Sequence, residues 1–256
     1  GLDPYAETAD LADDIIRAAT RLGPGMAGDF LDAVDPENIV AGLEWIGAAT
    51  EVLRSSGPDV PSLSALRSVA RQGSSFTRGA PPWQVGWSQA GAVRDFFQIG
   101  SDRRLDIDQV LRTWDAPETG VPIDQLTAPI RRSRPHGDKA LQALGGARGE
   151  GIGVVLARRQ PQPTRRFTAA RALWHAIYSD DPLFLVTAAY TDRQKIERAF
   201  AAELLAPAAG IAEHLENAVD AVEPEDVDEV ARHFDVSPMV IEHQVSNQLV
   251  ASRYPR

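Results

Sequence analysis

The sequence predicts an α+β protein that is mostly helical and contains one small β-sheet. Apolar residues recur at helical spacing along much of the 256-residue chain, which is typical of amphipathic helices that pack on a core. Residues 151–157 form a short β-branched run bounded by turn residues, as expected for a buried strand. The chain has no cysteine, which excludes a disulfide scaffold and thiol chemistry.

Residues 1–80 are expected to form an N-terminal all-helical unit. One amphipathic helix should end at Gly23, and a second should begin after Asp35, because an aspartate can accept hydrogen bonds from the free N–H groups of a first turn. A third, shorter helix should close at Gly73. The Gly-, Ser- and Pro-rich segment 73–82 is the expected linker. It places a domain boundary near residue 80.

Residues 81–256 are expected to form a second domain around the strand at 151–157. The glycine-rich segment 145–151 precedes that strand and lacks the Lys-Ser/Thr of a phosphate-binding loop, so we expect it to be a flexible connection. Helical patterns cover residues 83–98, 107–114, 164–178 and 190–206, and a broken, helix-turn-helix-like pattern covers 225–249.

The charge balance restricts the classes of partner. The chain has 36 acidic and 26 basic residues, a formal net charge of −10. Nucleic acids and anionic membranes both require clustered cations for extended contact, so neither is an expected partner. No run of residues approaches the roughly 18 apolar positions of a membrane span, and the first residues do not resemble a signal peptide. We therefore expect a cytoplasmic protein.

Two blocks carry the functional information. Residues 166–175 read Arg-Phe-Thr-Ala-Ala-Arg-Ala-Leu-Trp-His, and residues 198–207 read Arg-Ala-Phe-Ala-Ala-Glu-Leu-Leu-Ala-Pro. The first block follows the predicted strand, and the second block follows the first. In this order the two blocks resemble the ImmA/IrrE family of zinc metallopeptidase-like proteins. That family reads Arg-Phe-Thr-x-Ala-His-Glu-Leu-x-His on its active-site helix and later Phe-Ala-x-Glu-Leu-Leu-x-Pro. The resemblance covers about residues 82–256 and implies a zincin-like metallopeptidase domain.

The zinc chemistry that this resemblance implies is not supported by the residues. A zincin helix binds zinc through two histidines at i and i+4, uses the glutamate after the first as general base, and needs a third ligand. Here the first histidine position is Arg171, the general-base position is Ala172, only His175 is kept, and the third-ligand position falls near Gln194. A guanidinium has no lone pair for a metal. We expect no zinc, no other cofactor and no catalytic residue of the family type.

Two interpretations of the degenerate metal site stay open. Arg171 could form a structural ion pair that closes a dead pocket, or the pocket could be repurposed so that Arg171 receives an anionic ligand or a peptide carboxylate. The nearby acids that could pair with Arg171 are Asp180, Asp181, Asp192 and Glu197.

The resemblance implies a regulatory role, because such proteins commonly sit beside a repressor in stress-response or mobile-element circuits. We expect a non-catalytic pseudo-metallopeptidase that binds a partner protein such as a transcriptional repressor. The alternatives are a metallo-endopeptidase with a non-standard site that cleaves a regulator, an anion or ligand sensor using Arg171, and a DNA-binding regulator. The pair at 225–249 has no Arg or Lys on its second helix before Arg253, which disfavours DNA binding.

Overall fold

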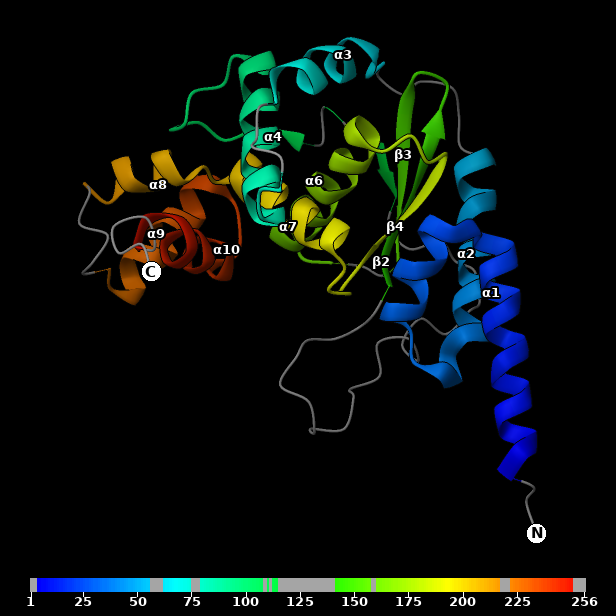
Figure 1. Cartoon of the computed structure of the whole chain (residues 1–256). Coiled ribbons are helices and arrows are strands. Elements are labelled where there is room, and N and C mark those ends of the chain that lie inside the picture. The colour runs from blue at the N-terminus through cyan, green and yellow to red at the C-terminus, as the bar shows by residue number, and fades with distance from the viewer. Residues whose placement is uncertain are drawn as a thin grey trace.

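A small mixed sheet lies between two helical layers in the computed structural model (Figure 1). The structure describes residues 4–55, 62–74, 79–107, 110, 112–114, 141–157, 160–216 and 222–250. The strands are β1 (Arg112–Trp114), β2 (Leu141–Arg148), β3 (Gly151–Leu156) and β4 (Leu183–Thr187), in the order β1-β3-β2-β4. The expected fold class, α+β and mostly helical with a small sheet, is confirmed.

The centre of the sheet is a hairpin that the sequence did not predict. β2 pairs antiparallel with β3 and with β4, while β1 runs parallel to β3. The hairpin turns at Gly149, whose φ of 56° suits glycine. A Cβ on Gly145 would lie 2.1 Å from the ring of Phe184, so β2 must have a glycine there. The expectation of a flexible connection at 145–151 was therefore wrong, as was that of a helix at 107–114, where residues 112–114 form a strand.

Four helices lie on one side of the sheet: α6 (Gln162–Tyr178) packs directly on the strands, α3 (Ser64–Gly73) and α7 (Asp192–Leu205) pack on α6, and α4 (Pro82–Phe97) packs on α3 and α7 (Figure 1). Along β3, Ile152 and Val154 join the core beneath these helices, whereas Val155 points to the opposite core, as the twofold alternation of a strand requires. α4 and α7 approach so closely that a Cβ on Gly86 would lie 2.4 Å from the carbonyl oxygen of Ile196.

The first two helices cover the other face. α1 (Pro4–Ala33) continues through a kink at Gly23, where φ is 74°, and the 3-10 turn η1 (Pro36–Asn38) leads into α2 (Ile39–Ser55). Phe30 and Trp45 from these helices share a core with Leu144 and Leu185 of the sheet. The boundary near residue 80 stays a prediction, and part of its expected linker, residues 75–78, lies outside the described residues.

The chain ends in a helical group that packs beside α7: α8 (Ala208–His214), α9 (Pro224–Phe234), α10 (Pro238–Gln244) and the π-helical turn η3 (Val245–Val250) (Figure 1). Asp235, with φ of 54°, turns the chain between α9 and α10, and Phe234 and Ile241 are buried where the two helices pack. Of the helices described, none is both long and apolar enough to span a membrane.

Candidate functional site

Two neighbouring helices place the degenerate metal-site residues opposite one another. Arg171 and His175 lie one turn apart on α6, and both are buried. α7 presents Gln194 and Glu197, also buried, one turn apart toward them. Ala172 lies in the hydrophobic core. The structure therefore brings three of the four predicted positions together and adds Glu197 to them.

Glu197 forms the centre of this group. Its Oε1 accepts hydrogen bonds from Nε of Arg171 at 2.7 Å and from Nη2 of the same guanidinium, and its Oε2 contacts Nε2 of His175. One carboxylate thus pairs with one guanidinium, and both are buried. Such a pair balances its own charge, and its hydrogen bonds offset part of the cost of removing both ions from water.

The other acids expected near Arg171 are engaged at the surface. Asp180 pairs with Arg71 at 2.8 Å, Asp181 pairs with Arg193 at 3.0 Å, and Asp192 pairs with Lys195 at 2.9 Å. The hydrogen bond and charge of Arg71 lower the pKa of the exposed Asp180 carboxyl below its usual value.

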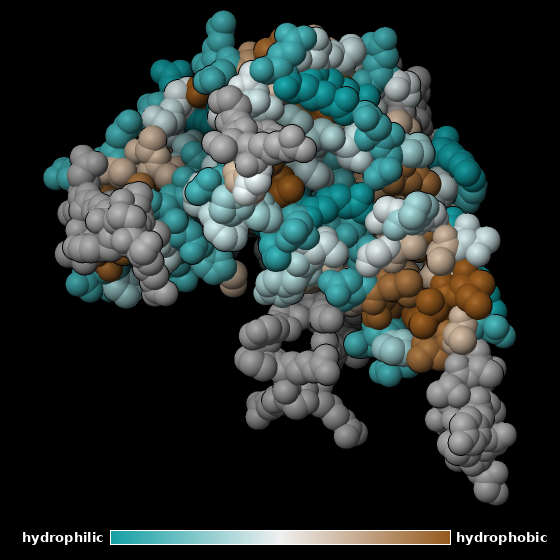
Figure 2. Space-filling model, viewed as in Figure 1, coloured by the Kyte–Doolittle hydropathy of each residue, from teal (hydrophilic) through white to brown (hydrophobic). Residues whose placement is uncertain are grey.

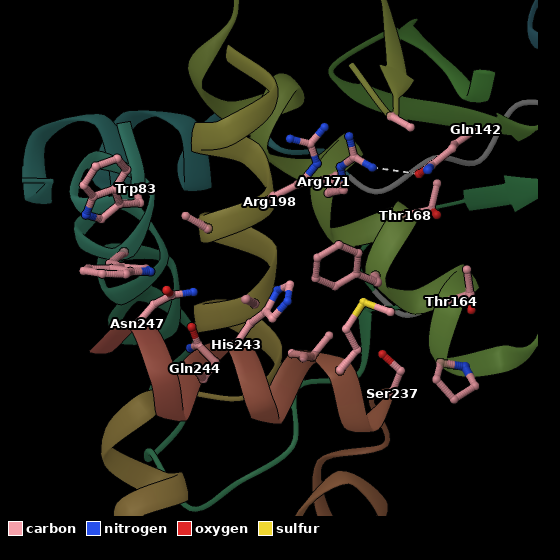
Figure 3. A pocket seen from close by; sticks show the side chains of 18 of the residues that line it. Trp83, Gln142, Thr164, Thr168, Arg171, Arg198, Ser237, His243, Gln244 and Asn247 are labelled. Atoms are coloured by element: carbon pink, nitrogen blue, oxygen red, sulfur yellow. Dashed lines mark hydrogen bonds between the residues drawn. The ribbon is translucent and has the colours of Figure 1, made fainter. Parts of the chain in front are cut away.

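The guanidinium of Arg171 also joins both helices to the sheet. Its Nη1 donates to Oε1 of Gln142 on β2 at 2.7 Å (Figure 3), and its Nη2 donates to Oε1 of Gln194 at 2.7 Å and to the carbonyl oxygen of Thr187. All three guanidinium nitrogens therefore donate to protein oxygens. This long, charged side chain fills the space between α6, α7 and the sheet.

His175 is enclosed on its remaining sides. Its ring stacks on Phe184 with centroids 4.4 Å apart and planes 7° apart, and the indole of Trp174 meets it edge-on at 4.9 Å. Within the described structure its Nδ1 is buried and has no hydrogen-bond partner. The tautomer with the proton on Nε2 donates to Glu197 and leaves only a lone pair on Nδ1.

The residues present do not fit a zinc ion. No three His, Asp or Glu side chains among the residues that the structure describes are grouped closely enough to hold a metal. His175 and Glu197 are the two potential ligands, and the Glu197 carboxylate that a metal would need is bound to the Arg171 guanidinium. A cation placed beside that guanidinium would be repelled at short range.

The N-terminal helix supports this site through Asp29. This buried carboxylate accepts from Nε2 of Gln194 at 3.1 Å, from Oγ1 of Thr191 at 3.0 Å, and from Nε of Arg193 at 2.9 Å. The hydroxyl of Thr191 in turn accepts from the backbone N–H of Gln194 at 3.2 Å and caps α7. Sequence reasoning missed Asp29, because its only signal was a carboxylate on the apolar side of a helix.

A cavity of about 890 Å³ adjoins the Arg171 site (Figure 3). Its walls come from the start of α4, from α6 and α7, and from α10 with η3. Arg171 and Arg198 both reach it, and sequence reasoning had given Arg198 no role. The cavity is the part of the site that a ligand could enter, whereas the Arg171–Glu197 pair is buried.

One known protein family matches the segment that contains this site. Residues 137–246 match the family model of the IrrE N-terminal-like domain, a metallopeptidase family model. Residues 137–246 therefore form an ImmA/IrrE-family domain. The matched segment holds α6 and α7 and therefore the whole Arg171–Glu197–His175 group. No curated protein and no solved structure matched significantly.

Proposed function

We propose that this ImmA/IrrE-family protein is non-catalytic and acts by binding. The observation that carries the proposal is the buried pair between Arg171 and Glu197. At the position where the family resemblance implies a first metal ligand, the chain has a cation that is hydrogen-bonded on all three nitrogens.

Among the residues that the structure describes, the surroundings of Arg171 supply no alternative metal-dependent hydrolytic centre. A metallopeptidase needs three ligands and an open coordination position, together with a base that activates the bound water. Ala172 is fully buried and carries no proton acceptor, and both oxygens of Glu197 are already occupied. These contacts argue against the alternative of a metallo-endopeptidase with a non-standard site.

The same contacts argue against an anion sensor that uses Arg171. An anion would have to displace the fully buried Glu197 from a guanidinium that is itself only 2% exposed. DNA binding is not supported either. Glu242 and His243 lie near the end of α10, and the described part of α10 and η3 contains neither Arg nor Lys.

The binding function that we propose is recognition of a partner protein, such as a transcriptional repressor, in a stress-response or mobile-element circuit. The support comes from the family, whose resemblance implies such regulation, and from the net charge of −10, which suits a protein partner better than a nucleic acid or a membrane. A cytoplasmic location belongs to the same proposal.

Metal content and peptidase activity test the non-catalytic proposal directly. Purified protein, incubated with excess zinc and then desalted, should retain less than about 0.1 zinc ion per chain in elemental analysis, because two ligands do not hold zinc tightly. Incubation with casein should give no cleavage that a chelator abolishes. About one zinc per chain, or chelator-sensitive cleavage, would overturn the proposal.

A further inference from the structure

The cavity beside Arg171 has the size of a small-molecule site. Its volume of about 890 Å³ lies within the usual range of roughly 300–1,000 Å³ for ligand pockets. Figure 3 shows side chains from three directions facing one another across it, with Trp83 on one side, Thr164 on the other and His243 between them.

The charge of the cavity lining is opposite to the charge of the chain. The lining residues that the structure describes include Arg171 and Arg198 but no Asp or Glu, although the sequence has 36 acidic residues. Glu197 compensates the charge of Arg171 beneath the lining. Arg198 donates to the carbonyl oxygen of Ala189 and lies 5.0 Å from the ring centroid of Tyr190, and no carboxylate in the described chain forms an ion pair with it.

Among the described residues, Arg198 is therefore a partly buried cation that forms no ion pair with a carboxylate. Burial, followed by repulsion from Arg171, lowers the pKa of its guanidinium to about 10, while Glu197 opposes these effects. At neutral pH the group is still charged. An anion bound beside it would offset the free-energy cost of its desolvation.

Besides polar side chains, the lining includes large apolar side chains that are exposed. Trp83, Tyr190 and Met239 are 47%, 56% and 62% exposed, and all three face this cavity. Large apolar side chains left in water together commonly mark a binding site. The other gathering of exposed apolar side chains covers α1 and α2 (Figure 2) and includes Ile16 and Val40. Nothing in the structure shows what would cover that second surface.

We propose that the cavity binds a small amphipathic monoanion with an aromatic or apolar body. Arg198 would bind the anionic group, because a guanidinium can donate two parallel hydrogen bonds to a carboxylate, sulfonate or phosphate. Trp83 and Met239 would contact the body of the ligand, and Asn247 would hydrogen-bond its polar substituents. This assignment goes beyond the proposed function and does not depend on partner binding.

A pair of dyes tests the proposal in the full chain. Anilinonaphthalene sulfonate is an amphipathic monoanion, and phenylnaphthylamine has the same ring system without the sulfonate. Fluorescence titration should give tighter binding of the anionic dye. Arg198→Gln should weaken the anionic dye about tenfold, equivalent to about 1.4 kcal/mol, and the neutral dye less than about twofold, because only the anionic dye forms a charge-assisted contact with the guanidinium. Arg198→Lys should restore most of the affinity.

Two further variants separate this cavity from other apolar surfaces. Trp83→Ala, at a half-exposed position that leaves the core unchanged, should weaken both dyes. Ile16→Ala on α1 is the matched control and should weaken neither. The proposal is overturned if Arg198→Gln and Trp83→Ala both leave the affinity for the anionic dye within about twofold of the unmodified protein, or if Ile16→Ala removes most of the signal. If Arg198→Gln does not fold, the test uses Trp83→Ala and Arg198→Lys. The proposal then requires that Trp83→Ala weakens both dyes and that Arg198→Lys keeps most of the affinity for the anionic dye, and it is overturned if Trp83→Ala weakens neither dye.

Discussion

Replacing Glu197 by glutamine removes one charge from the buried pair with Arg171 and keeps the shape of the side chain. The guanidinium, 2% exposed, would then be a buried cation whose remaining acceptors are neutral: the side chains of Gln142 and Gln194 and the carbonyl of Thr187. Removing one partner of a buried ion pair costs about 3–5 kcal/mol, since the other charge stays uncompensated. Glu197→Gln should lower the free energy of unfolding by this amount.

The size of the chain converts this free energy into a temperature. For a protein of this length, a change of 1 kcal/mol moves the melting temperature by about 2–4 °C, so the variant should melt about 6–20 °C lower. Glu51→Gln is the matched control, because Glu51 pairs with Arg54 at 2.7 Å with both side chains about 70% exposed. An exposed pair contributes at most about 1 kcal/mol.

A double-mutant cycle identifies the cause of the loss. Arg171→Met combined with Glu197→Gln leaves no unpaired charge, so the double variant avoids the cost of an uncompensated buried ion that the single variant carries. The double variant should therefore recover at least about half of the stability lost in Glu197→Gln, as measured by equilibrium denaturation with calorimetric melting. The reasoning is refuted if Glu197→Gln behaves like Glu51→Gln, or if the two substitutions destabilise additively.

Three other predictions test parts of the site and its support. Arg171→His adds an imidazole one turn from His175 and removes the repelling cation, so elemental analysis should find about one zinc per chain after reconstitution; unchanged metal content would contradict the proposed geometry. Asp29→Asn should lower stability by about 1.5–3 kcal/mol in urea denaturation, because charge-assisted hydrogen bonds to α7 are weakened, whereas Asp13→Asn on the exposed side of the same helix should have little effect. Burial raises the pKa of Glu203, so its contribution to stability is present at low pH and is lost as pH rises through that raised value. The stability of Glu203→Gln relative to the unmodified protein should accordingly increase between about pH 4 and pH 8, and a decrease would show the opposite shift.

Local patterns predicted most of the helices, although the helix expected at 107–114 was wrong and α8 was not predicted. The helices expected at 83–98, 164–178 and 190–206 correspond to α4, α6 and α7, because an amphipathic helix records its own period of 3.6 residues in the chain. Local patterns were insufficient to predict the sheet. β2 contains Gly145 and Gly146, which have low strand propensity, and it forms a strand because β3 and β4 supply hydrogen bonds and Phe184 packs against the bare backbone.

The candidate site divides in the same way. Positions 171, 172, 175 and 194 followed from helical spacing and the family motif, because one helical turn brings such residues to one side whatever the rest of the fold. Spacing could not select Glu197 among the four nearby acids, connect Asp29 to Gln194, or show that Arg198 reaches a cavity. Those relations join α1, α6, α7 and the terminal helices, and they depend on how these elements pack around the sheet.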